Sequence, residues 1–227
     1  MRALSNVLTA CAVLTLAFAA QSCGLWDPPG GDSENGSAVP QKASNIPFLT
    51  KEPDRYQANI TVTAFGEDGE ALVREYVIAK RGTDVAVVIG PGTDKELRLI
   101  DHSDKKFILN MRERSIRERA GGPSGDDLAE QLTRGWMTVT PGTKYEKLGT
   151  ENGITRFRVS PENLEASEIF VLYDENLKFP VGSEIYSVRE GARDLTFKYE
   201  VSEWKDTPDD NLFTVPEGFT EQPDNAN

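Results

Sequence analysis

The stretch EIFVLYDENLKFPVGSEIYSVREGARDLTFKYEVSE, from Glu168 to Glu203, decides the fold class. It reads as three strands separated by polar turns at 174–176 and at Glu190–Gly191. The third strand alternates apolar with polar residues, with Leu195, Phe197, Tyr199 and Val201 against Thr196, Lys198, Glu200 and Ser202. This period of two is typical of an antiparallel sheet with one face on a core and the other in water. We therefore predict an antiparallel meander here.

A second meander is predicted between Tyr56 and Asn110, where five apolar segments are separated by the turn sequences GEDGE, RGTD, GPGTD and DHSD. A further hairpin is expected from Thr143 to Ser160, because Asn152-Gly153 is a favoured tight-turn sequence. Turns at such regular spacing indicate an all-β sheet or barrel and not a βαβ fold.

The segment between the two meanders is predicted to be helical. In MRERSIRER, Met111–Arg119, Glu113 and Arg117 have the i, i+4 spacing of a helical ion pair. A Gly-Gly-Pro linker follows, and a second helix is expected to begin at a capping-box pattern formed by Ser124 and Asp127. Leu128 and Leu132 lie on one face of that helix, and Trp136 extends the face.

Composition excludes several classes of function. The chain has 227 residues, enough for one β-rich domain with appendages, and a formal net charge of −12, which disfavours nucleic-acid binding. One histidine and two cysteines cannot assemble a zinc site of the usual kind. A serine or cysteine triad would have to use His102, and there is no G-x-S-x-G motif, so we expect no enzyme activity and no cofactor.

Met1–Ser22 is predicted to be a signal peptide: Arg2 gives a positive start, and the apolar stretch 7–20 is too short to be a membrane span. Three cleavage patterns are present. Residues 17–19, Ala-Phe-Ala, fit ordinary signal peptidase; residues 20–23, Ala-Gln-Ser-Cys, resemble a bacterial lipobox, in which the cysteine becomes lipidated. Residues 8–11, Leu-Thr-Ala-Cys, fit the lipobox letters better but leave too little apolar length.

Cys23 is favoured as the lipid-attachment residue, because cleavage before it leaves the mature chain with one cysteine, at its first position. An exported protein with a single unmodified thiol would be unusual. Gly24 stands where some inner-membrane lipoproteins carry aspartate, which favours an outer-membrane location. Residues 23–53 are rich in Gly, Pro, Ser, Asp and Asn and are predicted to be a flexible tether, followed by a domain at 54–219 and a disordered tail at 220–227.

Two motifs carry a family resemblance. The second meander contains Y-D-x-N-L…P-V-G…Y, and the chain closes on D-N-L-F-x-V-P-x-G-F; the matching positions are Tyr173, Asp174, Asn176, Leu177, Pro180, Asp210, Asn211, Leu212, Phe213, Val215, Pro216, Gly218 and Phe219. With an exported, lipidated start and a helical insert between two meanders, this pattern resembles the LolA/LolB-like lipoprotein-carrier superfamily.

The resemblance implies a mainly β (α+β) fold: a curved, antiparallel, incompletely closed β-barrel with the helical insert over its mouth. Its hydrophobic hollow would hold acyl chains of lipids or lipoproteins, whereas some relatives are sensor modules that bind a partner protein. It implies no catalytic residue. A soluble shuttle would lack a lipid anchor, so this chain is more similar to the anchored members.

Inward-facing apolar side chains are the candidates for lining such a hollow: Ile60, Val62, Val87, Ile89, Leu128, Leu132, Trp136, Phe157, Phe197 and Tyr199. The same alternation would be produced by a packed core, so both interpretations stay open. Two functions follow from them. The first is an anchored envelope protein that accommodates a lipid or lipoprotein acyl chain and acts in lipid or lipoprotein trafficking. The second is a partner-binding envelope module whose interior is filled by its own side chains.

Other polar candidates have simpler explanations. His102 lies in a turn, and the aspartate pairs (Asp101 and Asp104, Asp126 and Asp127, Asp209 and Asp210) lie where turns and helix starts favour aspartate, without the spacing of a calcium loop. The basic cluster of Lys105, Lys106, Arg112, Arg114, Arg117 and Arg119 could steer anionic headgroups or dock a partner, or it could be a solvated helix face.

Overall fold

The computed structural model describes residues 46–48, 51–66, 68–119, 125–137, 142–162 and 166–222, without the side chains of Arg134 and Trp136. Cys23 and the expected signal peptide lie outside these residues and stay predictions. In the described part of the chain, no helix is long and apolar enough to cross a membrane.

The protein is built on a single 12-stranded sheet. The first meander comprises β1 (Arg55–Phe65), β2 (Ala71–Arg81), β3 (Asp84–Ile89), β4 (Leu97–His102), β5 (Lys105–Asn110) and β6 (Ser115–Glu118). The helix α2 (Gly125–Leu132) and the 3₁₀ turn η1 (Arg134–Met137) follow. The second meander comprises β7 (Lys144–Glu151), β8 (Ile154–Ser160), β9 (Ser167–Asp174), β10 (Phe179–Arg189) and β11 (Ala192–Lys205), and the chain closes with the 3₁₀ turn η2 (Asp210–Phe213) and β12 (Thr220–Glu221).

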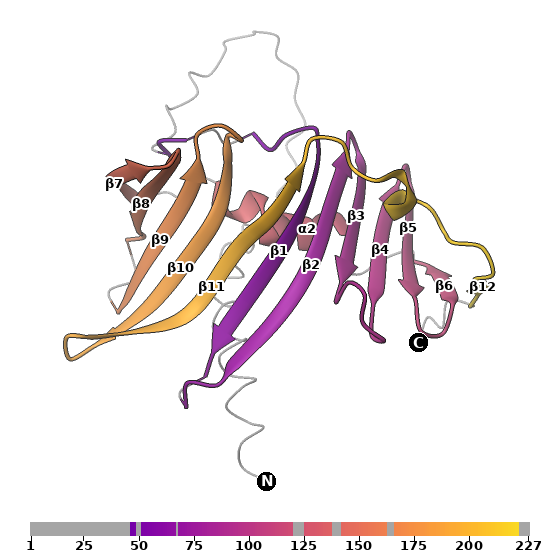
Figure 1. Ribbon diagram of the computed structural model, residues 1–227, viewed down its shortest axis with the longest axis horizontal. Coiled ribbons are helices and arrows are strands. Elements are labelled where there is room, and N and C mark those ends of the chain that lie inside the picture. Colours follow the sequence, from indigo (N-terminus) through magenta and orange to yellow (C-terminus); the bar gives the residue numbers. More distant parts are fainter. Residues whose placement is uncertain are drawn as a thin grey trace, which may run out of the picture.

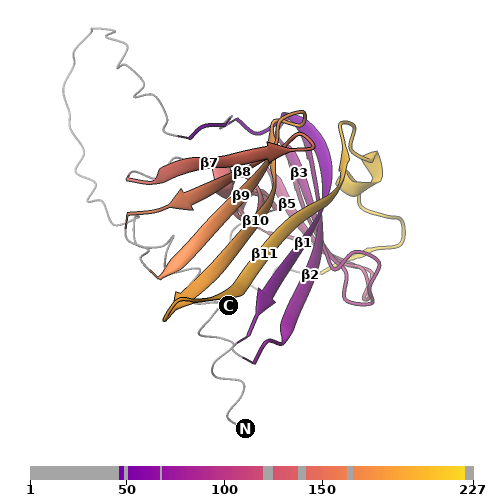
Figure 2. The ribbon, with the colours of Figure 1, turned by 60° about the vertical axis from the view of Figure 1, so that its left-hand side comes forward.

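The two meanders join in the middle of the sheet. The strand order is β12-β6-β5-β4-β3-β2-β1-β11-β10-β9-β8-β7, so the first strand of one meander pairs with the last strand of the other (Figure 1). The sheet curves but does not close (Figure 2). The helix α2 lies behind the central strands in Figure 1, and its side chains pack on the inner face of the sheet. This architecture confirms the predicted open, curved antiparallel fold with a helical insert.

Local sequence explains two of the tight turns between strands. The tight turn between β7 and β8 has positive φ at both Asn152 (50°) and Gly153 (81°), as the predicted two-residue turn requires. Glu190 (50°) and Gly191 (84°) repeat this geometry between β10 and β11. These turns fix the register, and the register in turn fixes which side chains face inward.

The predicted helix at Met111–Arg119 is wrong. Residues 111–114 form a turn, in which the Asn110 side chain accepts the Glu113 amide at 3.1 Å and Arg114 has φ of 49°. The chain then pairs with β5 as β6, and Ile116 is buried opposite Leu109. Burial of Ile116 in a sheet overrides the helical propensity of the charged residues around it, because propensity is a weak prior against tertiary packing.

The second predicted helix forms, and a carboxylate from β4 caps its start. The Asp101 carboxylate lies 3.3 Å from the amide of Gly125 and 3.0 Å from that of Asp126, at the start of α2. A carboxylate there satisfies two amides that have no partner within the helix and opposes the positive end of the helix dipole. Ser124, the predicted cap, lies outside the described residues. The buried Asp101 therefore ties β4 to α2.

The C-terminal segment packs on the outer face of the sheet. Phe213 of η2 is buried against Ala79 and Ala86, and Phe219 packs near Leu109 and Ile116. Val215, in contrast, is 43% exposed. The sheet continues past Phe219 into β12, which pairs with β6 in parallel.

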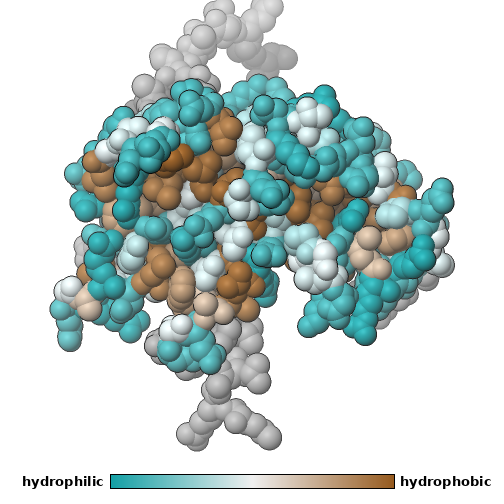
Figure 3. All heavy atoms as spheres, viewed as in Figure 1, coloured by the Kyte–Doolittle hydropathy of each residue, from teal (hydrophilic) through white to brown (hydrophobic). Residues whose placement is uncertain are grey.

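The outer face is otherwise mostly polar. Figure 3 looks onto this face, since the strands pass in front of α2 in the same view, and hydrophilic residues there interrupt the apolar ones. Phe170 of β9 is buried on this side beneath guanidinium groups of Arg156, Arg193 and Arg158, which lie 4.2, 5.3 and 5.8 Å from its ring centroid. These arginines pair with Glu184, Glu168 and Glu146, respectively, so their charges are locally neutralised.

Replacing Asp101 by asparagine should lower the free energy of unfolding by about 1 kcal/mol, because the capping carboxylate loses its charge and one acceptor. Urea unfolding, with the midpoint compared at constant m-value, measures this change. The matched control is Asp104→Asn, an exposed residue of the next turn, which should change stability by less than about 0.5 kcal/mol. Equal effects of the two substitutions would contradict the capping role.

Candidate functional site

The inner face of the sheet carries the candidate site, and it divides into three regions. The first lies under α2, and the second lies on β7 to β9. The third is a row of side chains that crosses the strands from β2 to β7. Each region follows from alternation along the strands, which sends every second side chain inward.

The region under α2 is closely packed. Its buried members are Tyr56, Ala58, Ile60, Tyr76, Ile78, Val85, Val87, Ala129, Met137, Phe179 and Tyr199, with Val62, Ile89, Leu99, Leu128, Leu132, Leu177, Phe197, Val201 and Trp204 half-buried around them. The Tyr56 ring stacks on Trp204 with centroids 4.7 Å apart. Ala129 and Leu132 of α2 close this region from above, so this part of the hollow is filled by the protein itself.

The second region is a pocket on β7 to β9 that a segment preceding β1 fills. Ile46 and Phe48 are buried there against Phe157, Val171 and Tyr173. Tyr145 and Val159 are half-buried at its edge. The packed part of the chain therefore extends at least to Ile46, ten residues before Tyr56, within the stretch that composition predicts to be a tether.

The third region, here called the inner row, crosses seven strands without interruption. It consists of residues that are register partners from β2 to β7: Leu72, Ala64, Phe197, Ile185, Ile169, Val159 and Tyr145. All seven are apolar or aromatic and all remain half-buried or exposed. With strands about 4.8 Å apart, six spacings give the row a length of about 29 Å along the sheet.

The predicted lining residues are thus divided between regions. Ile60, Val62, Val87, Ile89, Leu128, Leu132, Phe197 and Tyr199 belong to the packed region under α2, and Phe157 belongs to the filled pocket on β7 to β9. Phe197 also lies in the inner row. Trp136 is in η1, but its side chain lies outside the described atoms. Whether these residues line a ligand site stays a prediction.

Sequence reasoning missed most of the inner row. Ile169 and Ile185 alternate regularly within their strands, but the neighbouring Phe170 and Tyr186 are also apolar or aromatic, so the inward face of β9 and β10 could not be assigned from the sequence. The pairing of Ile169 with both Ile185 and Val159 resolves this ambiguity.

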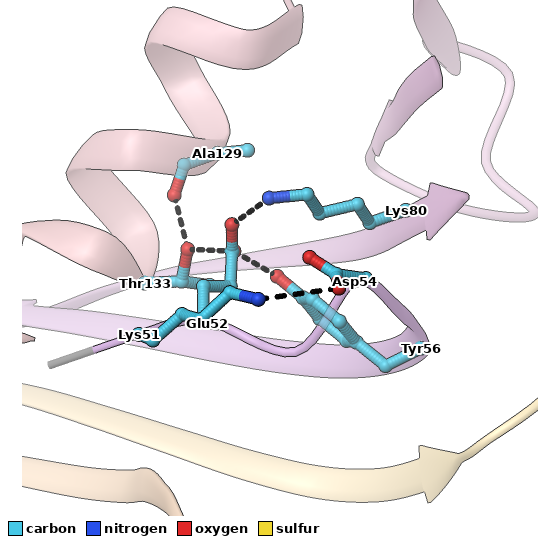
Figure 4. A network of polar contacts seen from close by, with 7 residues as sticks. All are labelled: Lys51, Glu52, Asp54, Tyr56, Lys80, Ala129 and Thr133. Carbon is cyan, nitrogen blue, oxygen red and sulfur yellow. Dashed lines mark hydrogen bonds and ion pairs between the residues drawn. The ribbon is translucent and has the colours of Figure 1, made fainter. Parts of the chain in front are cut away.

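A buried polar network lies beside the region under α2 (Figure 4). One carboxylate oxygen of Glu52 accepts the Tyr56 hydroxyl at 2.5 Å and lies 3.0 Å from the Thr133 hydroxyl. The other oxygen forms a salt bridge with Lys80 of β2. The Thr133 hydroxyl also lies 2.6 Å from the Ala129 carbonyl oxygen at the end of α2. Glu52 therefore connects the segment before β1 to β1, β2 and the helix.

Burial controls the protonation of the inner-face tyrosines. Desolvation, reinforced by the negative charge of Glu52, raises the pKa of Tyr56 well above its ordinary value of 10. The same two causes raise the pKa of Tyr199. Tyr56 consequently keeps its proton at any physiological pH and remains a hydrogen-bond donor to Glu52.

The polar candidates make local contacts with neighbouring side chains. His102 is 55% exposed on the outer side, and its Nδ1 lies 3.0 Å from the Asp84 carboxylate. Asp209 accepts Lys205 at 2.8 Å, a contact that lowers the pKa of its carboxyl, and Asp210 pairs with Arg81. Within the described residues, no group of three histidine, cysteine or acidic side chains is arranged to hold a metal ion.

The basic cluster does not form one face. Because residues 111–119 are a turn and a strand, its members are distributed over a hairpin edge: Lys105 pairs with Glu118 at 3.2 Å, and Arg114 donates to the Glu217 carbonyl oxygen at 2.9 Å. A hollow of about 130 Å³ lies nearby, lined by Leu97, Ile108, Asn110, Glu113, Ser115, Arg117 and Gln222. It is smaller than the roughly 300 Å³ of ordinary ligand pockets.

Comparison with known proteins finds solved structures that are similar to this chain. No model of a protein family matches the sequence, and neither does any curated relative. Among solved structures, an uncharacterized conserved protein from Thermus thermophilus is 9% identical with a TM-score of 0.43, covering 74% of this chain and 89% of that one. A LolA superfamily protein from Nitrosomonas europaea is 13% identical with a TM-score of 0.32, covering 71% and 90%.

A third similar structure is the MucA/MucB complex of Pseudomonas aeruginosa, which is 10% identical with a TM-score of 0.43. The match covers 71% of this chain but only 56% of that chain, so the present protein spans little more than half of that neighbour. The superfamily that the sequence motifs resemble is thus represented among the similar folds.

Removing the Glu52 side chain should destabilise the protein by about 3 kcal/mol or more, because Lys80 and Tyr56 would be left buried without their acceptor. The variant Glu52→Ala, measured by urea unfolding, tests this, and the double variant Glu52→Gln/Lys80→Met should regain part of the loss. The control is the neighbouring pair Lys51–Asp54, whose side chains are 81% and 76% exposed at 3.3 Å separation. Its removal should cost less than about 1 kcal/mol; comparable losses would refute a special role for the buried network.

Proposed function

We propose that this protein is a lipid-anchored binding protein of the bacterial cell envelope that accommodates an acyl chain of a lipid or lipoprotein on its inner face and takes part in envelope lipid or lipoprotein trafficking. The inner row is the observation that carries the proposal. It is a continuous apolar strip on the concave side, and its side chains are still partly in contact with water.

The dimensions of the inner row suit an acyl chain. A bilayer core about 30 Å thick contains two leaflets, so one lipid chain spans about 15 Å. The row is about 29 Å long, nearly enough for two such chains end to end. Each methylene that leaves water contributes about 0.8 kcal/mol, which would give useful affinity without polar recognition.

The sequence supports the envelope location. The signal peptide and lipobox would export the chain and anchor it at Cys23, on the periplasmic side of a membrane, with Gly24 favouring the outer membrane. Residues 24–45 would then connect the anchor to the packed domain. No catalytic group is needed, so the protein is proposed to be a binding protein and not an enzyme.

Substituting a polar residue in the inner row should weaken acyl-chain binding. In a titration with a fluorescent long-chain fatty acid, Ile185→Asn should raise Kd at least tenfold, which corresponds to about 1.4 kcal/mol. Val73→Asn is the matched control: Val73 is 54% exposed and its register partner Thr63 places it on the outer face, so Kd should not change.

Two results would overturn this function. If the unsubstituted chain takes up no fatty acid and native mass spectrometry of protein purified from a bacterial envelope shows no bound lipid, the inner row is not an acyl site. An envelope protein found bound in that same spectrum, without lipid, would favour the partner-binding module instead.

Lipid attachment is tested separately by metabolic labelling with radioactive palmitate. The unsubstituted chain should be labelled and Cys23→Ser should not, because the thiol that carries the lipid is gone. Cys11→Ser is the control for the competing lipobox and should keep the label. Equal labelling of the Cys23→Ser variant would rule out the proposed anchor.

A further inference from the structure

The aromatic pocket on β7 to β9 is occupied by a side chain from the same molecule. The ring of Phe48 stacks on Tyr173 with centroids 5.0 Å apart and an interplanar angle of 21°. The ring of Phe157 lies 5.5 Å from that of Phe48 in a tilted arrangement, and the Tyr145 ring is nearly perpendicular to it at 6.1 Å. Phe48 is 8% exposed and Ile46 is 6% exposed, whereas Pro47 between them faces solvent.

The chain bends at Pro47 and Phe48, and both neighbours of the exposed Pro47 are buried. Ile46 and Phe48 therefore enter the pocket together while Pro47 points out. The segment forms no strand of the sheet, which distinguishes it from the framework of paired strands around it.

The position of this segment relates it to the inner row. Tyr145 and Val159, at the edge of the pocket, are also the last two members of the row. An apolar chain that follows the row from β2 toward β7 reaches the Phe48 pocket at its end. The pocket and the row are one apolar surface, and Ile46–Phe48 covers its last part.

We propose that the pocket formed by Tyr145, Phe157 and Tyr173 is a subsite for the methyl end of an acyl chain, and that Phe48 occupies it until the ligand displaces it. This inference rests on the proposed acyl-binding function and assigns the end of that site. A ligand that must displace Phe48 binds only the small fraction of molecules in which the pocket is open. Its apparent Kd therefore equals its Kd for the open pocket divided by that fraction.

The contacts that hold the chain next to Phe48 favour a displacement of Ile46–Phe48 alone. Downstream of Phe48, Glu52 holds the chain through its salt bridge with Lys80 and its hydrogen bond with Tyr56. Those contacts are made with β1 and β2, on the α2 side of the sheet, and do not involve the pocket residues. Ile46–Phe48 can leave the pocket while Glu52 stays in place.

The test is a titration of the full chain carrying Cys23→Ser, purified without detergent, with a fluorescent long-chain fatty acid. Phe48→Ala should lower Kd about tenfold, because the competing ring is gone. The matched control is Phe179→Ala, which removes another buried ring, one that packs on Tyr56 and Trp204 outside the pocket. That variant should not bind more tightly.

A second variant keeps the bulk of the side chain and so does not depend on tolerance of a cavity. In Phe48→Trp, saturation with unlabelled oleate should increase quenching of the added tryptophan by acrylamide, relative to the parent chain with its own tryptophans. Unchanged quenching, or an unchanged or raised Kd for Phe48→Ala while the parent chain binds the fatty acid, would show that Phe48 is ordinary core. Failure of the parent chain and all variants to bind would instead overturn the proposed function.

Discussion

The pairing of β1 with β11 is the constraint on which the rest of the structure depends. It joins residues about 140 positions apart, from Gln57 opposite Lys205 to Ala64 opposite Phe197. β1 also pairs along its whole length with β2, so it is the seam between two meanders that could each form from local hairpins. Because side chains alternate strictly, the register of this one seam aligns the inner faces of both halves into one surface. Loss of the seam would leave two short sheets, each with an exposed edge.

The sequence was sufficient for the parts of the fold that are encoded locally. Alternation from Tyr56 to Ala64 and from Phe197 to Val201, with turns such as Asn152-Gly153, correctly predicted the strands and the open β architecture. The Met111–Arg119 region was mispredicted because its charged residues favour a helix locally, whereas the deciding contact, Ile116 with Leu109, belongs to the sheet. Asp101 was seen as a turn residue, although its partners are amides 24 and 25 positions away.

The candidate site was less predictable for the same physical reason. Ile46 and Phe48 lie in a stretch whose composition indicates a tether, and two apolar residues around one proline have no periodicity that could be recognised. Their burial depends on three aromatic rings from β7, β8 and β9, contributed by residues about 100 or more positions later in the chain. Glu52 is likewise an unremarkable acidic residue until β2 and Thr133 enclose it. Contacts between residues so far apart in the sequence are set by the assembled sheet and not by the local sequence pattern.

The inner face of the sheet is covered unevenly, and its uncovered apolar part is a source of binding free energy. α2 covers the region around Ile78 and Val87, where burial is complete, and Ile46–Phe48 cover the pocket around Tyr173. The inner row between Leu72 and Tyr145 keeps part of its apolar area in water. Apolar surface that stays exposed forgoes about 25 cal/mol for every square ångström, and that free energy remains available to whatever covers the row. Ile46–Phe48, at one end of the row, belongs to no strand of the sheet. Its contacts could therefore be exchanged for those of an incoming chain without breaking any strand pairing.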